Sequence, residues 1–149
     1  MQPTTIIQKQ IAILLAGDTT TLAAAGGLVV HLAKQAFTPS TTLDPTTLVS
    51  ADFDGYTALL PTPGPQIEYW DPVSGLYTVE IKEPAGGWHY QCTGPGNLPQ
   101  TIYGWFVTDS TNTKLYGSGL LDTPVPMTGA GQGLNLPTLQ FAFSNNSPM

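Results

Sequence analysis

Residues 101–108 form the most uniformly hydrophobic stretch of the chain, with aromatic and β-branched side chains and no charge. Alternate side chains of a strand point to opposite faces. Ile102, Gly104 and Phe106 are therefore expected on one face, and Trp105 is expected on the other. Both faces therefore need cover, which predicts an inner strand. Gly104 at its centre is tolerated where another group comes close, and we expect an aromatic ring from a facing strand to rest on it.

Alternating hydrophobic and polar positions predict several more short strands. The pattern favours strands near residues 28–33, 56–60, 67–70, 76–82, 88–92, 114–121 and 134–143. Pro124 and Pro126 are expected to end the strand before them. A count of about eight short strands, separated by turns rich in Gly, Pro, Asn and Asp, predicts a mainly β fold, namely an antiparallel β-sandwich or jelly roll.

Residues 1–17 follow a different period. Ile7, Ile11, Leu14 and Leu15 recur at the spacing that places them on one face of an amphipathic helix. The sequence leaves three interpretations open: an anchor that binds a partner or a sister subunit, a helix that packs on its own domain, and the apolar part of a secretory signal. As an anchor, this stripe is the candidate interface. No stretch of the chain is long enough to span a bilayer.

The chain is therefore expected to have an N-terminal helix over 1–17, a linker of small residues over 18–27, a β-sandwich domain over 28–143 and a polar tail over 144–149. At 149 residues the chain fits one domain. A domain of this size buries roughly two-thirds of the surface of its unfolded chain, enough to fold without disulfide bonds.

Charge is scarce, at 9% of residues with a net charge of −6 at pH 7. The positive side chains are four lysines that lie far apart in the sequence, Lys9, Lys34, Lys82 and Lys114. A nucleic-acid partner requires a basic face, so none is expected. The polar surface must instead consist of Thr, Ser, Asn and Gln, a composition that is common on extracellular and virion surfaces.

The residues with reactive side chains favour structural roles. Cys92 alternates with Trp88 and Tyr90, which predicts a buried thiol rather than a nucleophile. His31 is flanked by apolar residues and is expected to be a hydrogen-bonded sheet residue, whereas His89 is expected to face solvent. Neither histidine has the neighbouring ligands of a zinc site.

Asp52 and Asp54, followed by Gly55, resemble the start of a calcium-binding loop. The remaining ligands of such a loop are missing, so a turn is the favoured interpretation. No two acidic residues stand out as a glycosidase pair, and the motifs of hydrolases, phosphate loops and dinucleotide sites are absent from the sequence. We therefore expect no metal, no cofactor and no enzyme activity.

Residues 28–33, 37–39, 48–56 and 102–109 together resemble small β-rich proteins encoded among the structural genes of tailed bacteriophages, over most of 28–143. The resemblance implies a virion structural protein, foremost a capsid decoration (cement) protein made in the host cytoplasm and located on the capsid surface. Its implied partners are the major capsid protein or other virion proteins and further copies of itself, with no membrane and no catalytic residues.

The alternative is a head-fibre or tail-associated module that recognises glycans or a receptor through exposed aromatic rings such as Tyr69, Trp70 or Trp88. A buried set of tryptophans favours the structural role, and a row of rings that face solvent favours the binding module.

Overall fold

The computed structural model describes residues 2–3, 28–40, 42–62, 67–71, 73 and 76–144. This part of the chain is mainly β, and its paired strands are antiparallel, as predicted. It contains no α-helix and one short 3-10 helix, η1 (Pro45–Thr47). The predicted helix over 1–17, the linker over 18–27 and the tail after Ser144 lie outside the described residues, except for strand β1 (Gln2–Pro3).

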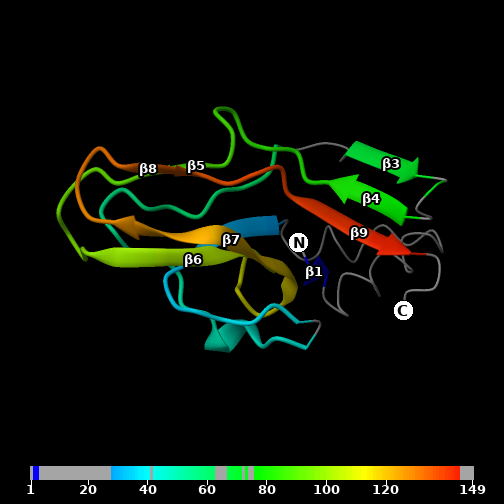
Figure 1. Ribbon diagram of the computed structural model, residues 1–149, viewed down its shortest axis with the longest axis horizontal. Coiled ribbons are helices and arrows are strands. Elements are labelled where there is room, and N and C mark those ends of the chain that lie inside the picture. The colour runs from blue at the N-terminus through cyan, green and yellow to red at the C-terminus, as the bar shows by residue number, and fades with distance from the viewer. Residues whose placement is uncertain are drawn as a thin grey trace.

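The largest sheet has the strand order β1-β7-β6-β2. Its other members are β2 (Leu28–Ala33), β6 (Gln100–Asp109) and β7 (Leu115–Met127). A second sheet has the order β3-β4-β9 and consists of β3 (Ile67–Asp71), β4 (Leu76–Glu80) and β9 (Gln140–Ser144). The short strands β5 (His89–Gln91) and β8 (Gly133–Asn135) pair with each other. Figure 1 shows β5 and β8 on one side of β6 and β7, and η1 on the other.

Strand β6 is buried on both faces, as its sequence predicts. Trp105 is 7% exposed and belongs to the main hydrophobic core, whereas Phe106 is 4% exposed and belongs to a smaller core on the opposite face. The main core joins the largest sheet to the β5 and β8 side and includes Val30, Leu32, Trp88, Tyr90, Ile102, Val107, Tyr116, Leu134, Leu136 and Leu139. The smaller core consists of Ala33, Phe106 and Leu115, with Phe37, Leu43 and Leu48 packed against it.

The predicted face of Ile102 is wrong. Ile102 lies in the main core with Trp105, not on the face of Phe106. The difference coincides with a register shift between the strands: Ile102 pairs with Val125 and Gly104 pairs with Leu120, so five steps along β7 match two steps along β6. Strand pairs are locally bent and twisted at such an irregularity, and simple alternation is not a reliable guide across it.

Strand β7 is longer than predicted, because it passes Pro124 and Pro126 and ends at Met127. Pro124 falls within the bulge, where no ladder hydrogen bond is required of it. Strand β1 pairs with β7 only at Gly117 and Ser118, so the outer edge near Pro126 has no strand partner among the described residues. Proline is tolerated at such an edge.

Two other predicted strands also differ. The stretch 134–143 is divided, since β8 ends at Asn135 and β9 begins at Gln140, and Pro137 lies in the interruption. Residues 56–60 contribute only an isolated bridge from Leu59 to Val30, which is part of β2. The first difference reflects Pro137, which interrupts a hydrophobic pattern.

The ring expected over Gly104 is replaced by backbone of the neighbouring strand. A Cβ atom on Gly104 would collide with the carbonyl oxygen of Gly119 and lie 3.0 Å from the Cα of Leu120. Gly119 in turn lies against Trp105, whose Cζ2 would be 2.5 Å from a Cβ at that position. The two glycines thus allow β6 and β7 to approach each other closely. The ring of Trp105 covers Gly119, not Gly104, and it comes from the same sheet.

We predict that Trp105→Ala and Phe106→Ala will each lower the free energy of unfolding by about 3–5 kcal/mol, because each change empties a buried site on a different face of β6. Chemical denaturation followed by circular dichroism measures the effect.

A matched valine pair provides the control for burial. Val107→Ala removes two methyl groups at 0% exposure and should cost about 1.5–3 kcal/mol, while Val73→Ala, at 94% exposure, should cost almost nothing. Equal stability of all four variants would show that β6 is peripheral.

Candidate functional site

The described residues contain an open groove of about 510 Å³ at the end of the largest sheet where β6 begins. Its lining consists of Lys34, Asp52, residues 97–101 and Tyr103. The antiparallel pairing of β2 with β6 brings the end of β2, and Lys34 after it, beside this part of β6. An isolated β-bridge between Ala33 and Ser50 brings Asp52, two residues further on, to the same end of the sheet.

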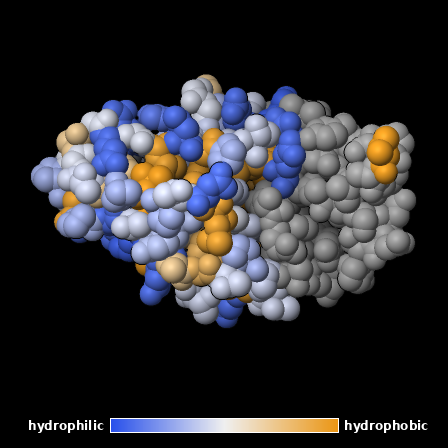
Figure 2. Space-filling model, in the orientation of Figure 1, coloured by the Kyte–Doolittle hydropathy of each residue, from blue (hydrophilic) through white to orange (hydrophobic). Residues whose placement is uncertain are grey.

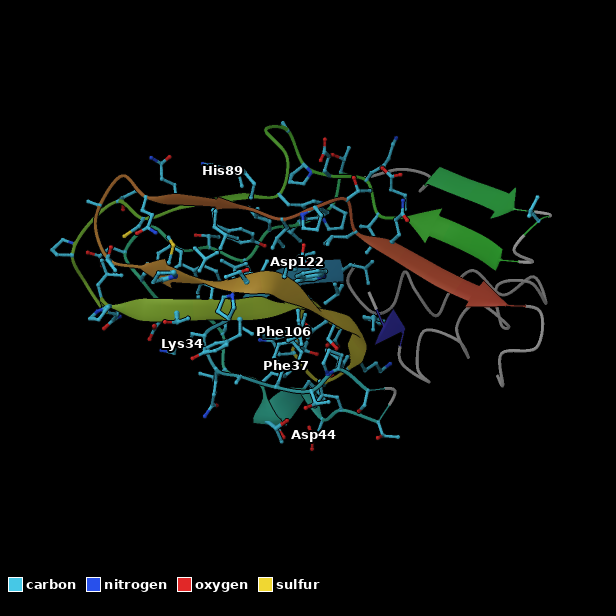
Figure 3. The ribbon with its side chains drawn as sticks, viewed as in Figure 1. Lys34, Phe37, Asp44, His89, Phe106 and Asp122 are labelled. Carbon is cyan, nitrogen blue, oxygen red and sulfur yellow. The ribbon has the colours of Figure 1, made fainter. Side chains whose placement is uncertain are left out.

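Figure 3 shows the surroundings of the groove. Lys34 lies on the same side of β6 as Phe37 and Asp44, and His89 lies on the other side of the molecule. Leu98, which also lines the groove, packs against the main core, so the groove lies where the start of β6 meets the loop that follows β5.

The polar groups of the groove hold one another in place. The Lys34 ammonium donates to Oδ1 of Asp52 at 2.6 Å, and the side-chain amide of Gln100 donates to the same oxygen. The Gln100 amide nitrogen also donates to the carbonyl oxygen of Asn97 at 2.7 Å, and the Asn97 amide donates to the carbonyl oxygen of Asp52 at 2.9 Å. The hydrogen bond from Lys34 is the main cause that lowers the pKa of the Asp52 carboxyl, and Gln100 adds to it.

Asp54 fixes the Gly- and Pro-rich loop that leads into the groove. Its carboxylate accepts from the backbone N–H of Gly96 at 2.9 Å, and its carbonyl oxygen accepts from the N–H of Thr93 at 2.9 Å. A Cβ atom on Gly96 would collide with the Asp54 carboxylate, so a glycine is required at this position. Asp54 therefore serves as a loop clamp.

The two aspartates of the calcium-like motif have separate partners. The Asp52 carboxylate binds Lys34 and Gln100, whereas that of Asp54 binds the loop backbone. Within the described part of the chain, no three His, Cys, Asp or Glu residues gather in a way that could hold a metal ion. The carboxylates are thus explained by bonds within the protein.

The remaining reactive side chains have structural positions. Cys92 is a buried free thiol, as predicted. His31 is also buried, and its Nε2 lies 3.0 Å from the hydroxyl oxygen of Thr108. Its ring stacks on that of Phe106, with the ring centroids 4.7 Å apart. Burial lowers the pKa of His31, and a hydrogen bond with Asn112 opposes this effect. His89 is exposed, as predicted, with Nδ1 2.7 Å from the side-chain oxygen of Asn135.

Asp109 organises the turn between β6 and β7. Its carboxylate accepts from the backbone N–H groups of Thr113 at 2.8 Å and Lys114 at 3.0 Å, and from the hydroxyl of Thr111 at 2.6 Å. Burial alone would raise the pKa of this carboxyl, but the hydrogen bonds from Thr111, Lys114 and Thr113 outweigh burial and lower the pKa to about 2. The ionised carboxylate is therefore the form that stabilises the turn.

The candidate interface residues of the N-terminal segment, Ile7, Ile11, Leu14 and Leu15, lie outside the described residues. Of the rings considered for glycan recognition, Trp88 is only 2% exposed and is part of the main core. The side chains of Tyr69 and Trp70 are outside the described part of the structure.

Comparison with protein-family models, curated proteins and solved structures found no match. No helix in the described ranges has the length and hydropathy needed to cross a membrane.

Sequence patterns did not identify the groove as a site. Lys34, Asp52 and Gln100 are far apart along the chain and follow no short motif. The one usable signal is indirect: Asp54 and the glycines near Gly96 suggest a tightly held loop, and such a loop positions the residues that follow it.

We predict that millimolar calcium will leave the melting temperature unchanged, because the carboxylates of Asp52 and Asp54 are engaged with different protein groups and a ligand stabilises only a site that it binds. Differential scanning calorimetry with and without calcium measures this. A rise of several degrees that disappears in the Asp52→Asn, Asp54→Asn double variant would contradict the prediction.

A second prediction concerns the dependence of stability on pH. An unfolded aspartate has a pKa of about 3.9, so the stabilisation from Asp109 is complete above about pH 4 and is lost as the pH falls towards the folded pKa of about 2. Asp109→Asn should therefore lower the melting temperature at neutral pH, with a difference from the parent that shrinks below pH 4.

Thermal unfolding between pH 2 and pH 7, followed by circular dichroism, measures this difference. Asp122→Asn is the matched control, because Asp122 is exposed on β7, and it should give the profile of the parent. A deficit in Asp109→Asn that is constant across this range would contradict a role for the ionised carboxylate.

Proposed function

We propose that this protein is a non-enzymatic structural component of a virion, namely a capsid decoration (cement) protein of a tailed bacteriophage. The observation that carries the proposal is the burial of Trp88 and Trp105, which are 2% and 7% exposed. Rings that are buried in the core are not available to a receptor, which favours the structural role over the binding module. The low content of charge supports the same role.

The proposal includes the finer features of the fold. The β body is a sandwich or jelly roll of about eight strands, and within residues 1–17 the hydrophobic stripe that follows strand β1 forms an amphipathic helix. Support for the layered arrangement comes from the main core, which joins Val30, Ile102 and Tyr116 of the largest sheet to Tyr90 and Leu134 of β5 and β8. Two faces that share one core are typical of packed sheets.

The proposed partners are the major capsid protein or other virion proteins, together with further copies of this chain. Their contact surface is the N-terminal stripe. On the face shown in Figure 2, hydrophobic residues lie in small groups separated by hydrophilic ones. The large hydrophobic side chains exposed on the described body are Val49, Leu60, Val73 and Leu120. They come from separate segments, so the continuous stripe over 1–17 is the better interface.

The energy available from this stripe is sufficient for assembly. Burial of four large aliphatic side chains supplies about 1.5–3 kcal/mol each before ordering costs. On a repeating capsid lattice, that amount decides whether sites are occupied. The proposal includes a position on the capsid surface after synthesis in the host cytoplasm, with no nucleic-acid or membrane partner.

We predict that replacing Ile7, Ile11, Leu14 and Leu15 together by Gln will abolish assembly and leave the β body folded, because the core described for the body already joins residues from Val30 to Leu139. Co-sedimentation with capsids that lack the protein measures binding, light scattering measures self-association, and circular dichroism measures folding.

Leu60→Gln is the control, because Leu60 is 59% exposed and lies outside the stripe. It should fold and assemble like the parent. A quadruple variant that folds and still binds capsids fully would end the anchor proposal. Loss of folding in that variant would instead mean that the helix packs on its own domain.

A further inference from the structure

The groove beside the start of β6 presents fixed polar groups with unused hydrogen-bonding capacity. The Asp52 side chain is 51% exposed, and its Oδ1 receives Lys34 and Gln100. No hydrogen bond to Oδ2 of Asp52 or to the hydroxyl of Tyr103 is formed within the described residues. Lys34, at 28% exposure, has three N–H donors and uses one on Asp52. Acceptors and donors therefore lie side by side at the surface of the groove.

These polar groups are already ordered before any ligand arrives. The Gln100 amide is held by Asp52 and by the Asn97 carbonyl oxygen, and the Asn97 amide is held by the Asp52 carbonyl oxygen. The Asp54 clamp fixes the loop that supplies Asn97. A site whose groups are fixed in advance avoids much of the ordering cost of binding.

The charge of the groove limits the class of ligand. Its charged residues are Lys34 and Asp52, which neutralise each other as an ion pair. An anionic ligand would meet the exposed Asp52 carboxylate, and a cationic one would meet the Lys34 ammonium. An uncharged ligand that carries hydroxyl groups is complementary instead, because each hydroxyl both donates and accepts.

The groove also supplies apolar surface. Leu98, Pro99 and the half-buried Tyr103 line it together with the polar groups. The register shift that places Tyr103 alone opposite residues 121–124 frees this residue from regular pairing. A ring with one C–H face and hydroxyl groups at its rim matches this combination. The volume, about 510 Å³, lies within the range of roughly 300–1,000 Å³ that is common for small-molecule sites.

We propose that this groove binds a neutral carbohydrate, with Asp52, Asn97 and Gln100 hydrogen-bonded to its hydroxyl groups and Tyr103 against the C–H face of a sugar ring. The site is separate from the proposed lattice contact over 1–17. Failure of carbohydrate binding would therefore leave the structural role untouched.

The test uses the full-length chain and a panel of methyl glycosides of glucose, galactose and mannose, with inorganic phosphate as an anionic probe. Binding is followed by saturation-transfer NMR and by the amide shifts of labelled protein. We expect a neutral glycoside to bind and to shift the backbone amide signals of residues 97, 98 and 100–103 but not those of 129–135. Phosphate should cause no shift.

Variants then assign the binding to the groove. Asp52→Ala should weaken binding by about tenfold or more, because it removes charge-assisted hydrogen bonds. Tyr103→Ala should abolish binding, whereas Tyr103→Phe keeps the ring and should retain most of it. Glu83→Ala is the matched control for Asp52→Ala, since Glu83 is also exposed but lies outside the groove. Melting temperatures establish that each variant is folded.

Three results would overturn the proposal: no binding of any neutral glycoside by the parent, binding that Asp52→Ala leaves unchanged, or shifts of residues 97–103 with phosphate alone. Asp52→Ala changes an exposed side chain, so the test remains decisive even where Tyr103→Ala reduces folding.

Discussion

The close approach of β6 and β7 at Gly104 and Gly119 is the constraint on which the rest of the structure depends. Without side chains at these positions, the backbone of β7 lies directly beside Gly104, and the Trp105 ring lies on Gly119. A side chain at either glycine would displace the ring or separate the strands. The main core is built around the face that this ring occupies, so a local steric condition in one strand pair determines how the hydrophobic residues of distant strands meet.

The same strand pair connects the fold to the groove. Beyond Gly104 the ladder cannot continue in regular register, because β7 carries extra residues, among them Pro124. At this irregularity Ile102 lies in the main core and Tyr103 lines the groove. Bulges often occur near binding sites, and here one irregularity lies between a buried core residue and a half-buried aromatic residue of the groove.

Local patterns in the sequence predicted the features that depend on local geometry. The opposite faces of Trp105 and Phe106, the buried Cys92 and the hydrogen-bonded His31 follow from alternation within single strands. The face of Ile102 was predicted wrongly because it depends on the pairing with β7, which alternation within β6 does not contain. The groove escaped prediction for the same reason, since its residues meet only through the pairing of β2 with β6 and the bridge from β2 to position 50.

The roles of Asp52 and Asp54 depend on the groups to which their carboxylates are hydrogen-bonded. Two residues apart, they resemble the first ligands of a calcium loop, yet one carboxylate belongs to the groove and the other clamps the loop at Gly96. The clamp holds the segment that brings Asn97 and Gln100 onto Asp52. The pair thus works as one unit, in which one acid fixes the backbone and the other presents its free oxygen to solvent. A metal-binding arrangement would require both carboxylates to converge, and the hydrogen bonds that order the groove keep them apart.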